Sequence, residues 1–153
     1  MPASTRPCPA GPRRSSLETT FPVSVKGVLL DRGRAVLLRN ERGEWELPGG
    51  RLEAGETPQE CVVREVLEES NLKVRVGPLL DAWVFEVVPG SRVLVLAYGC
   101  FVEDFAGMAH SVEHSGVRFF GLDQLGGVAL PDGYARVVRA WASHPAASGS
   151  SGL

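Results

Sequence analysis

Residues 50–72 read GRLEAGETPQECVVREVLEESNL and join a glycine-rich turn to a segment with strong helix signals. Thr57 suits the N-cap position, Pro58 suits the first helical position, and Glu60 completes a capping box with Thr57. Asn71 stands where the chain should leave the helix, and Asn is the residue other than Gly that most readily adopts the left-handed conformation there. The stretch therefore predicts a helix that begins at Pro58 and ends just before Asn71.

The predicted helix has one apolar side and one acidic side. A period of 3.6 residues groups four aliphatic side chains on one side: Val62, Val63, Val66 and Leu67. Glu65, Glu68 and Glu69 fall on the opposite side, related as i, i+3 and i+4, so their carboxylates converge. Like charges at this spacing repel by roughly 0.2–0.5 kcal/mol per pair, and Arg64 is the only positive charge nearby. We expect the apolar side to dock on the core and the acidic side to point away from it.

A bound cation explains this concentration of charge better than a solvated helix surface does. A surface selected for stability usually interleaves Lys or Arg with the acids. The helix also follows the glycine-rich residues 47–50, whose backbone can approach a metal or a ligand closely. Carboxylate oxygens are the ligands that a hard cation such as Mg²⁺ requires. The pattern therefore favours a metal site, whereas a purely structural acidic helix would bind no metal.

The chain has the size and composition of a single globular domain. Its 153 residues can bury a sizeable core, and 44% of them are hydrophobic. The net charge of −2 gives no electrostatic case for binding nucleic acid or an anionic membrane. No apolar run approaches the ~20 residues that span a bilayer. We therefore expect a small-molecule partner, with no nucleic acid and no membrane, in a monomer or homodimer.

Cysteines and histidines give no support for a disulfide framework or a zinc site. The cysteines are widely spaced and odd in number: Cys8, Cys61 and Cys100. Such a set suits a reducing compartment and predicts a cytoplasmic location. His110 and His114 have the i, i+4 spacing of a helical metal site, but Gly107 and Gly116 bracket them. We therefore assign both histidines to a solvated loop.

Three segments differ in composition. Residues 1–20 are rich in Pro, Ser and Arg and predict a flexible leader, for which a targeting role stays open. Residues 21–144 carry the apolar patterns of a folded domain. Residues 145–153, PAASGSSGL, predict a disordered tail.

The folded segment is predicted to be rich in strands, with a second helix near its end. Six stretches have strand patterns and are separated by turn signals: VSVKGVLLD, AVLLR, EWELPGG, VRVGPLLDAWVFEVV, SRVLVLAYGCFVED and VRFFGL. The third stretch runs into a Pro-Gly-Gly turn, and Pro89 and Gly90 join the two long strands. A helix is expected from Asp132 to about Ser143. This order predicts a mixed sheet covered by helices.

Residues 50–72 also resemble the Nudix box. That motif consists of Gly, five residues, Glu, seven residues, Arg-Glu, an aliphatic residue, any residue, Glu-Glu, any residue, Gly and an aliphatic residue. The matching positions are Gly50, Glu56, Arg64, Glu65, Val66, Glu68, Glu69 and Leu72. Asn71 replaces the last Gly, a change that affects cap geometry more than chemistry. Residues 45–49 and the strand order from about Val23 to Trp141 are similar to the family as well.

The resemblance implies an α/β (α+β) fold, namely a Nudix-type α/β/α sandwich with a central mixed sheet. It also implies a hydrolase that uses Mg²⁺ or Mn²⁺ to cleave the diphosphate linkage between a nucleoside diphosphate and another group, X. Carried over by position, Glu65, Glu68 and Glu69 would be metal ligands and act in catalysis, and the Gly49 carbonyl would add a ligand.

Supporting and proton-accepting roles follow from the same resemblance. Gly50, Glu56 and Arg64 would support the site, with Glu56 and Arg64 paired to hold the loop against the helix. The metal would neutralise phosphate oxygens and activate water, and a free carboxylate would accept the proton. Glu65 and Glu113 are both candidates for this base.

A cation should also contact the phosphates. Arg51 lies inside the box and Arg39 ends the second predicted strand, so either is a candidate for bidentate phosphate binding. The aromatic residues Trp83, Phe85 and Tyr98 lie on the long strands and receive no assigned role.

The substrate class is open at this point. ADP-ribose or another nucleotide sugar, and normal or oxidised nucleoside triphosphates, are the main candidates. Pro89 is similar to a proline of ADP-ribose-type members, but Pro-Gly between two strands is also an ordinary turn. The alternative function is a Nudix-fold binding or regulatory module that has lost catalysis, and the complete acidic set counts against it.

Overall fold

The computed structural model describes residues 18–148. The strands are β1 (Val23–Asp31), β2 (Arg34–Arg39), β3 (Trp45–Glu46), β4 (Gly49–Arg51), β5 (Val74–Val88), β6 (Ser91–Val102) and β7 (Gly116–Gly121). The helices are α1 (Pro58–Ser70), the 3₁₀ segment η1 (Leu122–Gly127), α2 (Asp132–Ala142) and the single turn α3 (Pro145–Ser148). Within these residues, no helix is long and apolar enough to cross a membrane.

The strands form one mixed sheet, as the sequence predicts. Its order is β3-β2-β1-β6-β5, with β4 paired to β1 and β7 paired to β2. β1 and β6 are parallel, and the other recorded pairs are antiparallel. β1 lies at the centre because it pairs with β2 at one end and with both β4 and β6 at the other.

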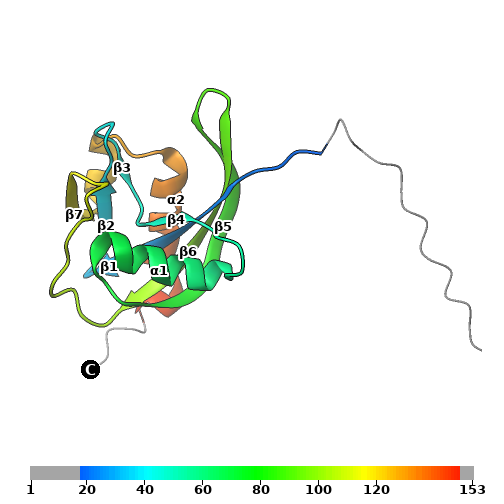
Figure 1. Ribbon diagram of the computed structural model, residues 1–153. Helices are drawn as coiled ribbons and strands as arrows, with labels where there is room; N and C mark the ends of the chain where they lie inside the picture. Colours follow the sequence, from blue (N-terminus) through cyan, green and yellow to red (C-terminus); the bar gives the residue numbers. More distant parts are fainter. Residues whose placement is uncertain (1–17, 149–153) are drawn as a thin grey trace, which may run out of the picture.

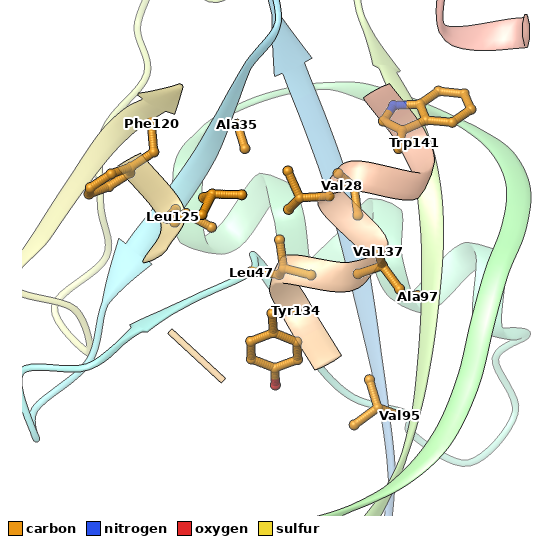
Figure 2. Packing of buried hydrophobic residues seen from close by; sticks show 12 residues of the cluster. Val28, Ala35, Leu47, Val95, Ala97, Phe120, Leu125, Tyr134, Val137 and Trp141 are labelled. Atoms are coloured by element: carbon orange, nitrogen blue, oxygen red, sulfur yellow. The ribbon is translucent and has the colours of Figure 1, made fainter. Parts of the chain in front are cut away.

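Helices cover both faces of the sheet, which confirms the predicted α/β/α sandwich (Figure 1). On one face, α1 contributes Val62 and Val66 to a core with Val25 and Leu29 of β1. On the other face, α2 packs on Val28 and its neighbours, and Figure 2 shows this second core around Leu47, Tyr134, Val137 and Trp141. Alternate residues of β1 therefore serve two cores, as the side-chain period of a strand requires.

The ends of α1 agree with the prediction. Thr57 is the N-cap, and the capping box with Glu60 is complete. At the other end Asn71 adopts the left-handed conformation, with φ 59° and ψ 23°, and its backbone N–H donates to the Leu67 carbonyl. Local sequence signals therefore set both ends of this helix.

The predicted faces of α1 are partly wrong. Val63 is 37% exposed and Leu67 is 42% exposed, although both were assigned to the apolar side. Glu69 is only 8% exposed, and Ser70 is fully buried. The helix is rotated so that the line from Val62 through Val66 to Glu69 and Ser70 faces the protein, which brings one acid inward instead of outward.

Two elements have no counterpart in the sequence prediction, and one differs from it. β4 forms where a Pro-Gly-Gly turn is predicted, because residues 49–51 pair with residues 24–26 of β1. η1 was not anticipated. α3 occupies the start of the segment predicted as a disordered tail, while the rest of that tail and residues 1–17 of the predicted leader lie outside the described residues.

Candidate active site

Glu69 is the acid of α1 that contacts β4. Its carboxylate oxygen Oε2 accepts a hydrogen bond from the Gly49 N–H at 2.9 Å. Burial raises the pKa of the Glu69 carboxyl to about 7, and nearby Glu65 adds to the rise, although Lys26 and the Gly49 N–H act in the opposite direction. The site therefore holds a buried negative charge that its neighbours compensate only in part.

Glu65 lies one turn earlier and packs across β4. A Cβ atom built on Gly50 would collide with the Glu65 carboxyl group, so any side chain at position 50 would displace Glu65. Gly50 is thus needed for the close approach of β4 and α1, not for an unusual backbone angle. This contact gives a physical reason for a glycine at the first position of the motif.

Arg64 ties the loop before α1 to the helix. Its Nε and Nη2 atoms donate to the two carboxylate oxygens of Glu56 at 3.0 and 2.8 Å, and Nη2 also donates to the Arg51 carbonyl at 3.2 Å. The Nη1 atom donates to Glu65 at 2.8 Å and to Glu68 at 3.3 Å. One guanidinium therefore contacts two of the three acids of the proposed metal site, and Glu56 fixes its orientation.

This pairing makes an acid-stability prediction. The hydrogen bonds from Arg64, with one from the Glu53 N–H, lower the pKa of Glu56 to about 2. Because the folded-state pKa lies below the ordinary value, the pair stabilises the fold above about pH 4.5, and this contribution disappears as the pH falls from about 4.5 to 2. We expect Glu56→Gln to be less stable than the wild type at pH 7 and to match it near pH 2.

Thermal melts of both proteins across this pH range measure the effect. Glu53→Gln is the matched control, because Glu53 lies on the same loop, is exposed and approaches Arg64 only to 3.9 Å. Its stability difference from the wild type should be small and independent of pH. A Glu56→Gln difference that stays constant from pH 7 to pH 2 contradicts the assignment.

The three acids of α1 differ in their surroundings. Glu68 has a side chain that is 59% exposed, Glu65 is half-buried beside Arg64, and Glu69 is buried. As they stand, no three His, Cys, Asp or Glu side chains of residues 18–148 form a group that could hold a metal ion. The donor set nevertheless suits a hard cation, because all three residues offer carboxylate oxygens from adjacent turns of one helix beside β4.

Lys26 of β1 is a charged residue of the site that sequence analysis missed. It is only 6% exposed, and its Nζ atom donates to the Gly49 carbonyl at 3.2 Å. The carbonyl predicted as a metal ligand therefore already contacts a cation. Burial alone lowers the pKa of Lys26, but Tyr134 and the carboxylates of Glu46 and Glu69, among others, outweigh it and raise the pKa. The available signal was a lysine in the middle of a mostly apolar strand.

Glu46 and His114 form a second missed pair. His114 Nε2 lies 2.8 Å from Glu46 Oε1, and His114 Nδ1 lies 3.2 Å from the Ser111 hydroxyl. The prediction of a solvated His114 is wrong, because this side chain is buried. Burial raises the pKa of Glu46, but Lys26, His114 and Asn40 outweigh it, and the net shift is downward.

The same loop carries Glu113, the alternative candidate for the base. The Ser111 N–H donates to the Glu69 carbonyl at 3.1 Å, which docks this loop on the end of α1. Glu113 itself is exposed. The loop that carries Glu113 therefore contacts the end of α1 through Ser111, and, among the residues that the structure describes, no hydrogen bond or ion pair joins the Glu113 side chain to the acids of α1.

A pocket of about 250 Å³ opens beside Lys26 and Glu46, which both belong to its lining. It lies between β1, β3, the β5–β6 hairpin and the start of α2, and its lining includes Lys26, Asn40, Arg42, Trp45, Arg51, Phe85 and Tyr134. Of the two predicted phosphate-binding arginines, Arg51 is in this lining and Arg39 is not. Tyr98 is buried in the core beneath α1, and Trp83 packs edge-on against Tyr134 at a centroid distance of 6.1 Å. Of Trp83, Phe85 and Tyr98, only Phe85 belongs to the lining of the pocket.

Comparison with known proteins identifies the family. The model of the NUDIX domain matches residues 20–141. With the sandwich fold and the motif at β4 and α1, this match shows that the chain belongs to the NUDIX domain family.

Individual relatives match shorter parts of the chain. A MutT-like protein from Streptomyces ambofaciens is 43% identical over 74 residues, which cover 47% of this chain and 48% of that protein. An ADP-ribose pyrophosphatase from Methanocaldococcus jannaschii is 37% identical over 65 residues, covering 40% and 38%. The matches thus span about half or less of these relatives. The crystal structure of a MutT protein from Methanosarcina mazei Go1 superposes with a TM-score of 0.70 at 27% identity, covering 81% of this chain and 94% of that one.

Proposed function

We propose that the protein is a metal-dependent hydrolase that cleaves the phosphoanhydride linkage of a nucleoside diphosphate joined to another group. The observation that carries this proposal is the position of the acidic side of α1 beside β4. Arg51 of β4 lines a pocket together with Lys26, Arg42 and aromatic rings, and the acids Glu44 and Glu46 also belong to this lining. The acids suit a divalent cation, and the cations and rings suit phosphate and base. A helix whose acids only form an exposed surface would need neither the contact with β4 nor the adjacent pocket.

Glu65, Glu68 and Glu69 are the residues that would hold Mg²⁺, with Mn²⁺ as the alternative. When bound, such a cation neutralises phosphate oxygens and lowers the pKa of a coordinated water. Arg64 keeps Glu65 and Glu68 oriented through its own contacts with Glu56. The Gly49 carbonyl already accepts a hydrogen bond from the Lys26 ammonium, and this adjacent positive charge disfavours it as a further metal ligand.

Proton acceptance is assigned to a carboxylate of the site. Glu65 is the first candidate, because it lies between Arg64 and Gly50 with its carboxyl group fixed. Glu113 is the second candidate, because its loop docks on the Glu69 carbonyl through Ser111. Comparing the pH–rate profiles of Glu65→Gln and Glu113→Gln separates them, because only the variant that lacks the base loses that group's contribution to the acidic limb, whereas titration of Glu69 contributes in both variants.

The substrate class is proposed from the pocket and from the relatives. ADP-ribose and other nucleotide sugars come first, because a relative is an ADP-ribose pyrophosphatase. Normal and oxidised nucleoside triphosphates come second, because one relative is an 8-oxo-dGTP diphosphatase and another is a CTP pyrophosphohydrolase. The pocket volume of about 250 Å³ lies below the roughly 300–1,000 Å³ that is usual for ligand sites, so it should hold one nucleoside end and not both.

The test measures product release from ADP-ribose, nucleotide sugars, dinucleotide polyphosphates and nucleoside triphosphates, each with Mg²⁺ and with EDTA. We expect cleavage of one class that EDTA abolishes. Mg²⁺ should also raise the melting temperature, because a ligand that binds only the folded state stabilises it by mass action. Mg²⁺ stabilisation without any cleavage would favour the non-catalytic binding module, and no Mg²⁺ effect at all would favour a purely structural acidic helix.

We also propose that the protein works in a reducing compartment such as the cytoplasm. Cys61 and Cys100 are free and buried. Burial raises the pKa of both thiols to about 12, so neither is a ready thiolate nucleophile. Cys8 lies outside the described residues.

A further inference from the structure

Lys26 occupies a buried position in the middle of β1, a strand whose other buried residues are Gly27 and apolar side chains. It shares a face of the strand with Val28, which packs in the core beneath α2. In the sheet register Lys26 stands directly opposite Gly49 of β4. A charged group is costly at such a place unless it is paired, so its presence calls for a specific role.

The surroundings of the Lys26 ammonium are acidic and polar. Its Nζ atom donates to the Gly49 carbonyl at 3.2 Å and lies 5.9 Å from the centre of the Tyr134 ring. The carboxylates of Glu46 and Glu69 act on its charge. An ammonium carries three N–H donors, and for Lys26 the structure records one hydrogen bond within residues 18–148.

Lys26 also belongs to the lining of the pocket, together with Arg51. It therefore stands at the boundary between the acids of α1 and the space in which a ligand fits. An anionic ligand that enters this pocket meets repulsion from Glu44 and Glu46 of the lining and from Glu69, which bonds the Gly49 N–H. Lys26 is a buried cation of the pocket lining, and its positive charge offsets this repulsion.

We propose that Lys26 is a phosphate-binding residue that takes a non-bridging oxygen of the diphosphate and holds it beside the acidic side of α1. This inference rests on the proposed function for the identity of the ligand. The flexible four-carbon stem allows the ammonium to keep the Gly49 carbonyl as one partner while a phosphate oxygen becomes another. The protein should consequently bind a diphosphate group without any metal.

The first test uses the wild-type chain, which has two lysines, Lys26 and the exposed Lys73. Their side-chain ¹⁵N ammonium signals can be followed by NMR while methylenediphosphonate, an uncleavable diphosphate, is added in EDTA. We expect the Lys26 signal to shift and saturate while the Lys73 signal stays in place. An unmoved Lys26 signal, or equal and non-saturating shifts of both, overturns the proposal.

The second test compares dissociation constants for methylenediphosphonate in EDTA by calorimetry. Lys26→Gln should weaken binding by about 10- to 100-fold, the effect of losing one hydrogen bond to a charged group. Lys26→Arg should keep part of the affinity, and Lys73→Gln, the matched control, should keep all of it. A lysine that only stabilises the fold predicts equal affinities in all folded variants, and that result overturns the proposal. If Lys26→Gln fails to fold, the NMR titration decides.

Failure of this inference is distinguishable from failure of the proposed function. Metal-dependent cleavage with an unresponsive Lys26 removes the lysine assignment and leaves the hydrolase. A responsive Lys26 without cleavage of any substrate removes the hydrolase and leaves a diphosphate-binding site.

Discussion

Replacement of Glu69 by glutamine should lower turnover by about 10²–10⁴-fold, the range for loss of a group that acts directly in the reaction. The amide keeps the shape of the side chain, and its oxygen can still accept the Gly49 N–H that bonds Oε2 in the wild type. What it removes is the negative charge that faces β4. The loss should therefore fall on turnover and on metal affinity, with the fold intact.

Steady-state rates at saturating substrate and a Mn²⁺ titration measure these two effects, and circular dichroism checks the fold. Glu103→Gln is a suitable control, because Glu103 is an exposed glutamate that lines a separate groove past the end of β6. It should keep full activity. Wild-type turnover in Glu69→Gln would show that Glu69 is not a metal ligand.

Gly49→Ala is the second change with a large expected effect, here on stability. Gly49 has a φ of 141°, which side chains rarely tolerate, and a Cβ at this position would collide with the Val25 carbonyl oxygen of β1. Strained backbone and overpacking each cost about 1–3 kcal/mol. We expect the free energy of unfolding to fall by about 2–6 kcal/mol, the sum of the two costs, and the β4–β1 pairing to loosen.

Urea denaturation measures this change, and Gly126→Ala provides the matched control. Nothing lies within 4 Å of a Cβ built on Gly126 of η1, and its φ is not in the positive range. That variant should stay within about 0.5 kcal/mol of the wild type, as surface substitutions usually do. Equal stabilities for Gly49→Ala and Gly126→Ala would contradict the clash at β4. Because β4 carries both Gly49 and Gly50, the destabilised variant should also lose activity.

The sequence predicts those parts of the fold that depend on neighbouring residues. The start and end of α1 follow from Thr57, Glu60 and Asn71, which act within a few positions of one another. The strands follow from short apolar or alternating stretches that turn signals separate. The faces of α1 were less accurate, because Val63 and Leu67 look apolar but the sheet contacts only a narrower line of the helix. Hydrophobicity alone does not fix that rotation.

The site is harder to predict because its contacts join distant parts of the chain. Glu46 and His114 are 68 positions apart, and Lys26 and Gly49 are 23 positions apart. Neither pair has a local pattern, and both depend on the register of the sheet. The Nudix box identifies the acids, but it contains neither Lys26 nor His114. The available signal for these residues was a charged or titratable side chain at a position that turns out to be buried. A local sequence pattern does not show which distant residue such a side chain contacts.

The two cores of the sandwich have a consequence for how such a site can diversify. The acids of α1 rest on the core of Val62 and Val66, whereas Tyr134 and Phe85 of the pocket rest on the core beneath α2. The β5–β6 hairpin that carries Phe85 extends beyond the body of the sheet (Figure 1). Substitutions in the hairpin and α2 can therefore change the pocket while α1 and its acids keep their packing, with β1 as the shared support.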